Sequence, residues 1–200
     1  MDRVMESLEH ILNNPPPSGW ADAQWRQSLL RHVLALLRSP PARRAELYAR
    51  ADRLRRATVG NDVPVRGIIE FSNLCVNDCL YCGIRKSNSL VRRYRLDDEE
   101  VMAVVKKMPS WRQGTVVLQS GECPGAEQDR RLGMLVQRIK NETGLAVTLS
   151  VGNRPREVYR DWRDRGMDRY LLRFECSDPR LFRQLHPDCS LEERLECLRA

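Results

Sequence analysis

The sequence predicts an α/β fold, in which a helical amino-terminal segment precedes part of a parallel (β/α) barrel. Two observations carry this prediction. Residues 1–60 place apolar side chains at helical spacing, whereas from residue 61 onward short apolar strands alternate with amphipathic helices. Alternating strands and helices join through right-handed crossovers into a parallel sheet. We therefore expect an amino-terminal helical segment, 1–60, and the amino-terminal half of a barrel, 61–200.

The amino-terminal segment is predicted to hold three helices. The first covers residues 1–12 and is broken by the Asn-Asn-Pro-Pro-Pro stretch at 13–17. The third begins at Pro40 and Pro41 and ends at Gly60, a residue typical of helix ends. The second covers residues 21–38 and carries an apolar stripe: Leu29, Leu30, Val33, Leu34 and Leu37.

The barrel segment is predicted to contain strands at residues 65–71, 115–119, 146–151 and 169–175. Between them we expect helices at 97–108, around Leu132, Leu135, Val136 and Ile139, from Pro155 to Gly166, and from Ser190 onward. Asp97 with Glu100 has the pattern of a capping box, and the first helix should bury Val101, Val104, Val105 and Met108. Four such units make about half a barrel, and the last helix is still running at Ala200, so we expect a truncated chain.

Strand alternation points to a polar interior. On the fourth strand one face carries Arg169, Leu171, Arg173 and Glu175, and the other carries Tyr170, Leu172 and Phe174. The first strand sets Arg66, Ile68 and Glu70 against Gly67, Ile69 and Phe71. Charges inside a barrel are costly unless they are paired or bound to something. The pattern indicates either a polar ligand cavity or an internal Arg–Glu network without a ligand.

The composition excludes several classes of protein. Hydrophobic residues make up 42% of the chain, but no apolar run approaches the ~20 residues of a membrane span. Residues 1–14 mix charges with apolar residues, unlike a signal peptide. Seven cysteines without such a signal indicate a reducing compartment, so we expect a cytoplasmic protein. The net charge of +7 comes largely from arginines interleaved with Ala and Leu at 43–56. These fit a solvated helix face better than a nucleic-acid patch, because no aromatic stacking motif accompanies them.

Three cysteines carry the chemistry. Cys75, Cys79 and Cys82 form C-x3-C-x2-C directly after a predicted strand. Three thiolates satisfy three irons of a 4Fe–4S cluster and leave the fourth iron open. The open iron can chelate the amino and carboxylate groups of S-adenosylmethionine (SAM), whose reductive cleavage yields methionine and a 5′-deoxyadenosyl radical. Tyr81 would place its ring beside the adenine end of that cofactor.

Zinc is the alternative ligand for this motif. Structural zinc sites usually have four Cys or His ligands, and no second C-x2-C is present. The three histidines, His10, His32 and His186, are remote from the motif in sequence. The other cysteines fit no cluster spacing and are expected to be small buried or incidental residues, with Cys123 and Cys176 nearest the site: Cys123, Cys176, Cys189 and Cys197.

These motifs resemble those of a known family. C-x3-C-x-aromatic-C marks the radical SAM superfamily. Flanking stretches resemble the HydE-type maturases of FeFe-hydrogenase, within the biotin-synthase-like group, at residues 66–88, 93–100, 116–122, 168–175 and 185–195. The resemblance covers roughly residues 25–200 and implies a radical SAM barrel.

The resemblance also assigns roles to residues. Ser120, Gly121 and Glu122 match a GGE-type motif that binds the methionine amino group, although S-G-E alone is a common turn. Arg173 and Glu175 match residues around the cofactor, with Glu175 suited to ribose hydroxyls.

Three arginines complete the expected site. Arg194 matches an arginine that pairs with the methionine carboxylate, a task that suits a guanidinium. Arg66 and Arg169 are similar to interior cations that hold an anionic substrate.

The implied activity is assembly of the diiron cofactor of FeFe-hydrogenase. The substrate would be an anionic cysteine-bound iron precursor or another small molecule. The implied partners are a flavodoxin- or ferredoxin-type electron donor and other hydrogenase maturation proteins. The alternatives are a biotin synthase- or methylornithine synthase-like enzyme, and a truncated cluster-binding fragment without activity. Residues 1–200 alone are expected to be inactive.

Overall fold

The computed structural model describes Glu6, His10 and residues 13–18 and 21–200. The first predicted helix, 1–12, lies outside the described residues apart from Glu6 and His10. The chain forms two compact units, Met1–Val63 and Pro64–Ala200.

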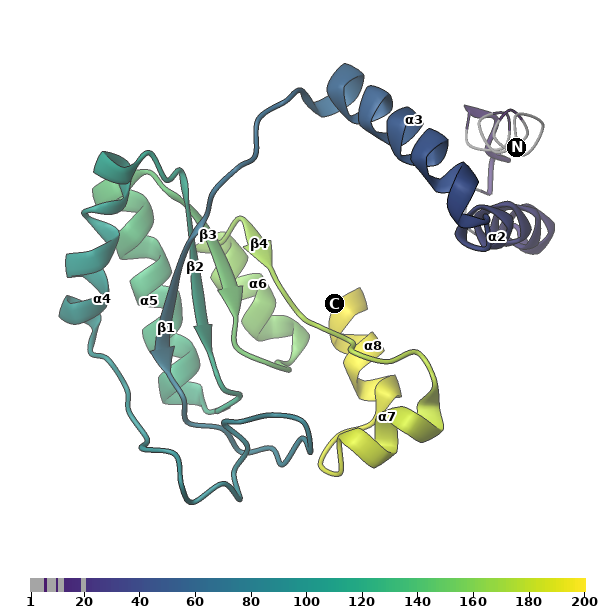
Figure 1. Ribbon diagram of the computed structural model, residues 1–200. Helices are drawn as coiled ribbons and strands as arrows, with labels where there is room; N and C mark the ends of the chain where they lie inside the picture. Colours follow the sequence, from purple (N-terminus) through teal and green to yellow (C-terminus); the bar gives the residue numbers. More distant parts are fainter. Residues whose placement is uncertain (1–5, 7–9, 11–12, 19–20) are drawn as a thin grey trace. The chain divides into compact units, whose positions relative to one another are not determined.

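The amino-terminal unit contains two long helices, α2 (Ala23–Leu37) and α3 (Pro41–Val59), both of which were predicted (Figure 1). The Asp22 side chain caps α2 by accepting a hydrogen bond from the Trp25 amide at 2.8 Å. Gly60 ends α3 with φ +78°, a conformation that favours glycine. Of the apolar stripe on α2, Leu29 is buried, whereas Leu30, Val33, Leu34 and Leu37 are exposed.

The second unit is built on a parallel sheet in the order β1-β2-β3-β4, as the alternation predicted. The strands are β1 (Gly67–Ser72), β2 (Thr115–Ser120), β3 (Ala146–Ser150) and β4 (Arg169–Tyr170). All neighbouring strands are parallel, so their carboxyl ends lie at the same end of the sheet.

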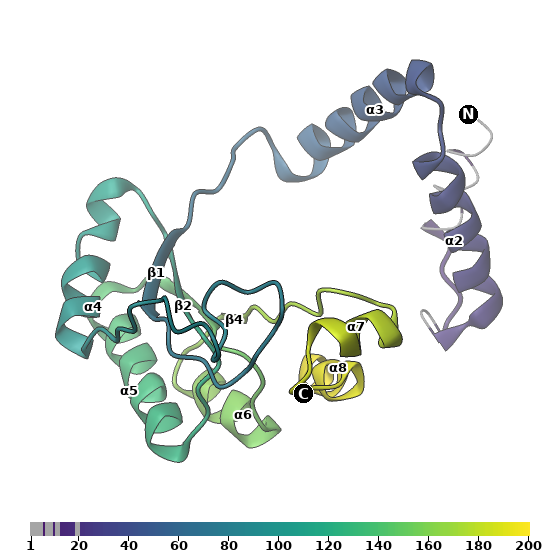
Figure 2. The same ribbon diagram turned by 60° about the horizontal axis from the view of Figure 1, so that its bottom comes forward.

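Helices α4 (Asp98–Val105), α5 (Ala126–Thr143) and α6 (Arg156–Asp164) cover one face of the sheet (Figures 1 and 2). The core lies between these layers and includes Ile69, Phe71, Leu118, Leu149 and Trp162. Within the described residues, no helix is long and apolar enough to cross a membrane.

Helix α4 differs from its prediction at one end. Its capping box is present, since Asp97 and Glu100 exchange hydrogen bonds of 2.8 Å. The helix ends at Val105, however, and a 3-10 turn, η2 (Met108–Trp111), follows. Pro109 explains the early end, because proline lacks an amide hydrogen and collides with the carbonyl four residues earlier. The buried face includes Met102, which is 1% exposed, rather than Val104, which is 37% exposed.

Strand β4 is shorter than the predicted strand 169–175. Strand β3 ends at Ser150, and Gly152 turns the chain with φ +85°. Beyond Tyr170 the Leu171 amide donates to the Leu149 carbonyl at 2.8 Å, and no later pairing with β3 is present among the described residues. As predicted, Tyr170 faces the helix layer, where its ring contacts Tyr159 and Trp162 of α6.

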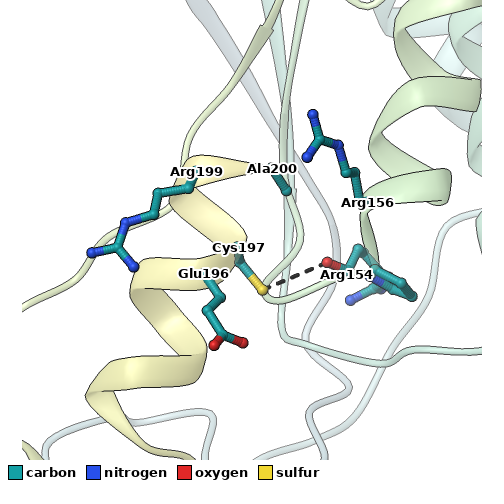
Figure 3. A pocket seen from close by; sticks show the side chains of 7 residues that line it. Arg154, Arg156, Glu196, Cys197, Arg199 and Ala200 are labelled. Atoms are coloured by element: carbon teal, nitrogen blue, oxygen red, sulfur yellow. Dashed lines mark hydrogen bonds between the residues drawn. The ribbon is translucent and has the colours of Figure 1, made fainter.

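Two short helices, α7 (Pro179–Leu185) and α8 (Leu191–Arg199), pack together beside the sheet (Figures 1 and 2). Ser190 and Glu193 form the capping box of α8. Figure 3 shows how α8 meets the segment before α6: the Cys197 thiol donates to the Arg154 carbonyl at 3.5 Å, beside a hollow of about 350 Å³. This contact ties α8 to the carboxyl end of the sheet.

Candidate active site

A cavity of about 250 Å³ lies at the carboxyl ends of the strands, the end where active sites of (β/α) barrels are found. It collects ten of the residues that the sequence singled out: Cys75, Cys79, Tyr81, Cys82, Ser120, Gly121, Glu122, Arg173, Glu175 and Arg194. Arg66 precedes β1, and Arg169 begins β4, so both lie at the amino ends of their strands. Neither lines this cavity.

The loop that carries the cysteines is held from both sides. The Val76 amide donates to the Glu122 carbonyl at 2.8 Å, and the Cys82 amide donates to the Cys79 carbonyl at 2.9 Å. The Arg93 guanidinium fastens the far side of the loop by donating to the carbonyls of Asn73, Ile84 and Arg85 at 2.7, 2.8 and 2.6 Å. Arg93 therefore acts as an internal brace for the cysteine loop.

The three thiols of the motif are free and partly buried in this cavity. Among the described residues, no group of three or more His, Cys, Asp or Glu side chains is gathered closely enough to hold a metal ion. Burial, together with the neighbouring thiols of Cys75 and Cys82, raises the pKa of Cys79 to about 11. Thiolates at this position therefore need a compensating positive charge, which the irons of a cluster would provide.

Gly121 allows the end of β2 to approach the cysteine loop. A Cβ atom at this position would collide with the Leu74 carbonyl oxygen and would lie 2.8 Å from the Cys75 Cβ. The Gly121 amide donates to the Ser72 carbonyl at 3.3 Å, which joins the ends of β1 and β2. The glycine of the S-G-E turn thus has a packing role that the sequence alone did not show.

Glu122 and Arg194 present complementary charges to the cavity. A Glu122 carboxylate oxygen accepts a hydrogen bond from the Asn153 amide at 2.9 Å and lies 4.0 Å from an Arg194 Nη. Arg194 is only 8% exposed, and its Nε has no hydrogen-bond partner among the described residues. Its Nη2 lies 3.8 Å from the Cys189 thiol. A buried donor without a partner and a carboxylate beside it fit a ligand that carries both a carboxylate and an amino group, as the methionine part of SAM does.

Arg173 and Glu175 follow β4 in an irregular segment that also lines the cavity. Glu175 has φ +61°, a conformation that non-glycine residues rarely adopt. Leu172 lines the cavity too, although strand alternation assigned it to the opposite face. The early end of β4 explains this, because alternation does not hold outside a paired strand.

Sequence reasoning gave no role to His186 or Cys189, both of which contact residues of the site. His186 lies at the carboxyl end of α7 and lines the cavity, 2.7 Å from the Tyr81 hydroxyl, although 105 residues separate the two. Cys189 contacts Arg194, but none of Cys123, Cys176 and Cys189 lines the cavity. Both residues lie in the stretch 185–195, which resembles the family, but the resemblance assigned a role to Arg194 alone.

Comparisons with known proteins agree with this geometry. The profile of the Radical SAM superfamily matches residues 69–200. The [FeFe] hydrogenase maturase subunit HydE of Thermotoga maritima is 47% identical over 76% of the chain and 43% of its own length. A 3-methylornithine synthase of Methanosarcina acetivorans is 31% identical over 74% of the chain and 43% of its own length.

Solved structures give the same answer for the fold. A crystal structure of methylornithine synthase superposes with a TM-score of 0.73 and 27% identity, over 99% of this chain and 54% of that one. The chain thus spans about half the length of the relatives that it matches. It belongs to the radical SAM superfamily, in the group that contains HydE and methylornithine synthase.

Proposed function

We propose that this chain is the SAM- and cluster-binding portion of a HydE-like enzyme that takes part in assembly of the FeFe-hydrogenase diiron cofactor. The observation that supports this most is the shared cavity, which is lined by the three cysteines of C-x3-C-x2-C together with Glu122 and Arg194. The 47% identity to the T. maritima maturase favours this role among the activities of the superfamily.

Each cavity residue has a proposed task. Cys75, Cys79 and Cys82 would hold a 4Fe–4S cluster, which supplies the electron for reductive cleavage of SAM to a 5′-deoxyadenosyl radical. Arg194 would pair with the methionine carboxylate, and Glu122 would accept hydrogen bonds from the methionine amino group. These two contacts orient the cofactor and replace the water that would otherwise solvate its charges.

The remaining residues act on the nucleoside side. Glu175 would accept hydrogen bonds from the ribose hydroxyls, and Arg173 lies in the same segment. Tyr81 would face the adenine with its ring. A low-potential electron carrier of the flavodoxin or ferredoxin type would reduce the cluster, and other maturation proteins would supply and receive the iron-containing species.

The test uses the complete reading frame that contains these residues, reconstituted with iron and sulfide without oxygen. Reduction in the presence of SAM should release 5′-deoxyadenosine, measured by mass spectrometry. The purified protein should then restore hydrogen production to apo-hydrogenase in a maturation mixture that lacks HydE. Cys79→Ala should abolish the EPR signal of the reduced cluster and both activities.

A methylornithine synthase-like activity is the second candidate, supported by the 31% identity to 3-methylornithine synthase. The two candidate activities form different products. Formation of 3-methylornithine, without any restoration of hydrogenase, would favour this candidate over the first. Stoichiometric zinc with no cluster would overturn both.

A further inference from the structure

Residues 185–188, which run from the end of α7 into the loop before α8, contact the cysteine loop directly. The Leu80 amide donates to the Leu185 carbonyl at 2.9 Å, and the Asp78 amide donates to an Asp188 carboxylate oxygen at 2.5 Å. Between these two contacts, the Tyr81 hydroxyl and the His186 Nε2 lie 2.7 Å apart. Three residues of the loop, Asp78, Leu80 and Tyr81, are therefore tied to one short segment that is remote in sequence.

His186 is buried, and its ring face and both ring nitrogens make contacts. It is 2% exposed, and its ring stacks on Phe182 with centroids 4.0 Å apart. Its Nδ1 lies 3.0 Å from the Phe182 carbonyl oxygen. A carbonyl only accepts, so Nδ1 carries the hydrogen, and in the neutral ring Nε2 must be the acceptor for the Tyr81 hydroxyl. The tyrosine ring meets the histidine edge to face, with centroids 5.3 Å apart.

We propose that His186 is a positioning residue, which holds the Tyr81 ring and the adjoining Cys79–Cys82 turn in the orientation that receives SAM. This inference rests on the proposed function, because it assigns His186 a role in binding the same cofactor. The tyrosine has no other hydrogen-bond partner for its hydroxyl among the described residues. Since α7 and α8 pack together, the helix pair that carries Arg194 also orients the tyrosine.

Two substitutions separate the hydrogen bond from the packing of the histidine. His186→Phe keeps an aromatic ring over Phe182 but cannot accept from Tyr81. The Phe182 carbonyl stays paired in this variant, because it also accepts from the His186 backbone amide at 2.8 Å. His186→Gln loses the ring but places an amide oxygen near the position of Nε2, so it can still accept.

The measurement is the affinity for SAM, from the change that SAM causes in the EPR spectrum of the reduced cluster in the complete reading frame. Loss of one hydrogen bond should weaken binding roughly three- to tenfold in His186→Phe, with affinity close to wild type in His186→Gln. Unchanged affinity in His186→Phe, or equal loss in both variants, would overturn the proposal, because either result assigns the histidine to packing alone.

Tyr81→Phe provides an independent test, because it removes the same hydrogen bond from the other side. It should weaken SAM binding as much as His186→Phe, and the double variant should lose no more than either single variant. Additive losses would contradict the inference even if one variant folds poorly. Iron and sulfide content is measured for every protein: a wild type without a cluster refutes the proposed function itself, whereas normal clusters with unaltered SAM binding in both single variants refute only the role of His186.

Discussion

Outside the cysteine motif, Arg194 is the residue whose loss should most weaken SAM binding. Its guanidinium is buried, and its Nε lacks a partner among the described residues. Arg194→Ala should weaken SAM binding by roughly 1.5–3 kcal/mol, because it removes a charge-assisted contact. The EPR titration of the reduced cluster with SAM measures this loss.

The control lies on the same helix. Arg199 is exposed near the end of α8, so Arg199→Ala should leave the affinity within about twofold of wild type, as expected for an exposed substitution. An Arg194→Ala protein that binds SAM as tightly as this control would exclude Arg194 from the cofactor site.

Gly152 limits where the Glu122 carboxylate can lie. It has φ +85°, and a Cβ atom there would collide with the Glu122 carboxyl group. Gly152→Ala should destabilise the fold by about 1–2 kcal/mol through backbone strain, and it should also weaken SAM binding by displacing Glu122. Gly114→Ala is the matched control, since a Cβ there meets no atom within 4 Å. Chemical denaturation and the SAM titration would test both effects; equal behaviour of the two variants would contradict the prediction.

At the scale of elements, a buried ion pair joins the helices to the loops that carry the site. Arg154, before α6, donates from Nε to the Asp129 carboxylate of α5 at 2.6 Å. Its other nitrogens donate to the carbonyls of Val151, Asn153 and Cys123. The pair therefore links α5 to the segments that follow β2 and β3, from which Glu122 and Gly152 approach the cavity.

Breaking this pair should destabilise the protein strongly. Asp129→Ala leaves the Arg154 charge buried without its partner, at a cost of about 3–5 kcal/mol. Asp164→Ala removes the partner of Arg163 in an exposed pair on α6 and should change stability by less than about 0.5 kcal/mol. Urea denaturation of the complete reading frame measures both, and a loss below about 1 kcal/mol for Asp129→Ala would show that Arg154 finds another partner.

At the scale of the whole molecule, the helices α4, α5 and α6 of the second unit cover one face of its sheet (Figure 1). Ile68 is 61% exposed on the other face, and β1 and β4 form the two edges of the sheet. Residues 1–200 expressed alone should therefore be marginally stable, prone to aggregate and unable to mature hydrogenase. A thermal melt by circular dichroism and a maturation assay test this against the complete reading frame. A cooperative, monomeric melt with full activity would contradict it.

The sequence by itself determined the order of the elements, the parallel sheet and most of the site. Helical and strand periodicity is a local property, and the caps at Asp97, Ser190 and Gly60 involve neighbours within a few residues, so each could be predicted. The cysteine spacing and the flanking motifs indicated the superfamily. The resemblance named further residues around the cofactor, and ten of the residues singled out from the sequence line one cavity.

The tertiary structure decided what depends on contacts between distant segments. His186 contacts Tyr81 although 105 residues separate them. This distance in sequence is why the histidine was not predicted to lie near the cysteine motif. Arg66 and Arg169 have the charge that an anionic substrate needs, but strand direction places them at the amino ends, away from the cavity. Strand β4 is short because its partner, β3, ends at Ser150. Its length therefore depends on the partner strand and not on the sequence of residues 171–175. Alternation specifies which face a side chain occupies, whereas strand length and the meeting of loops depend on the packed neighbours.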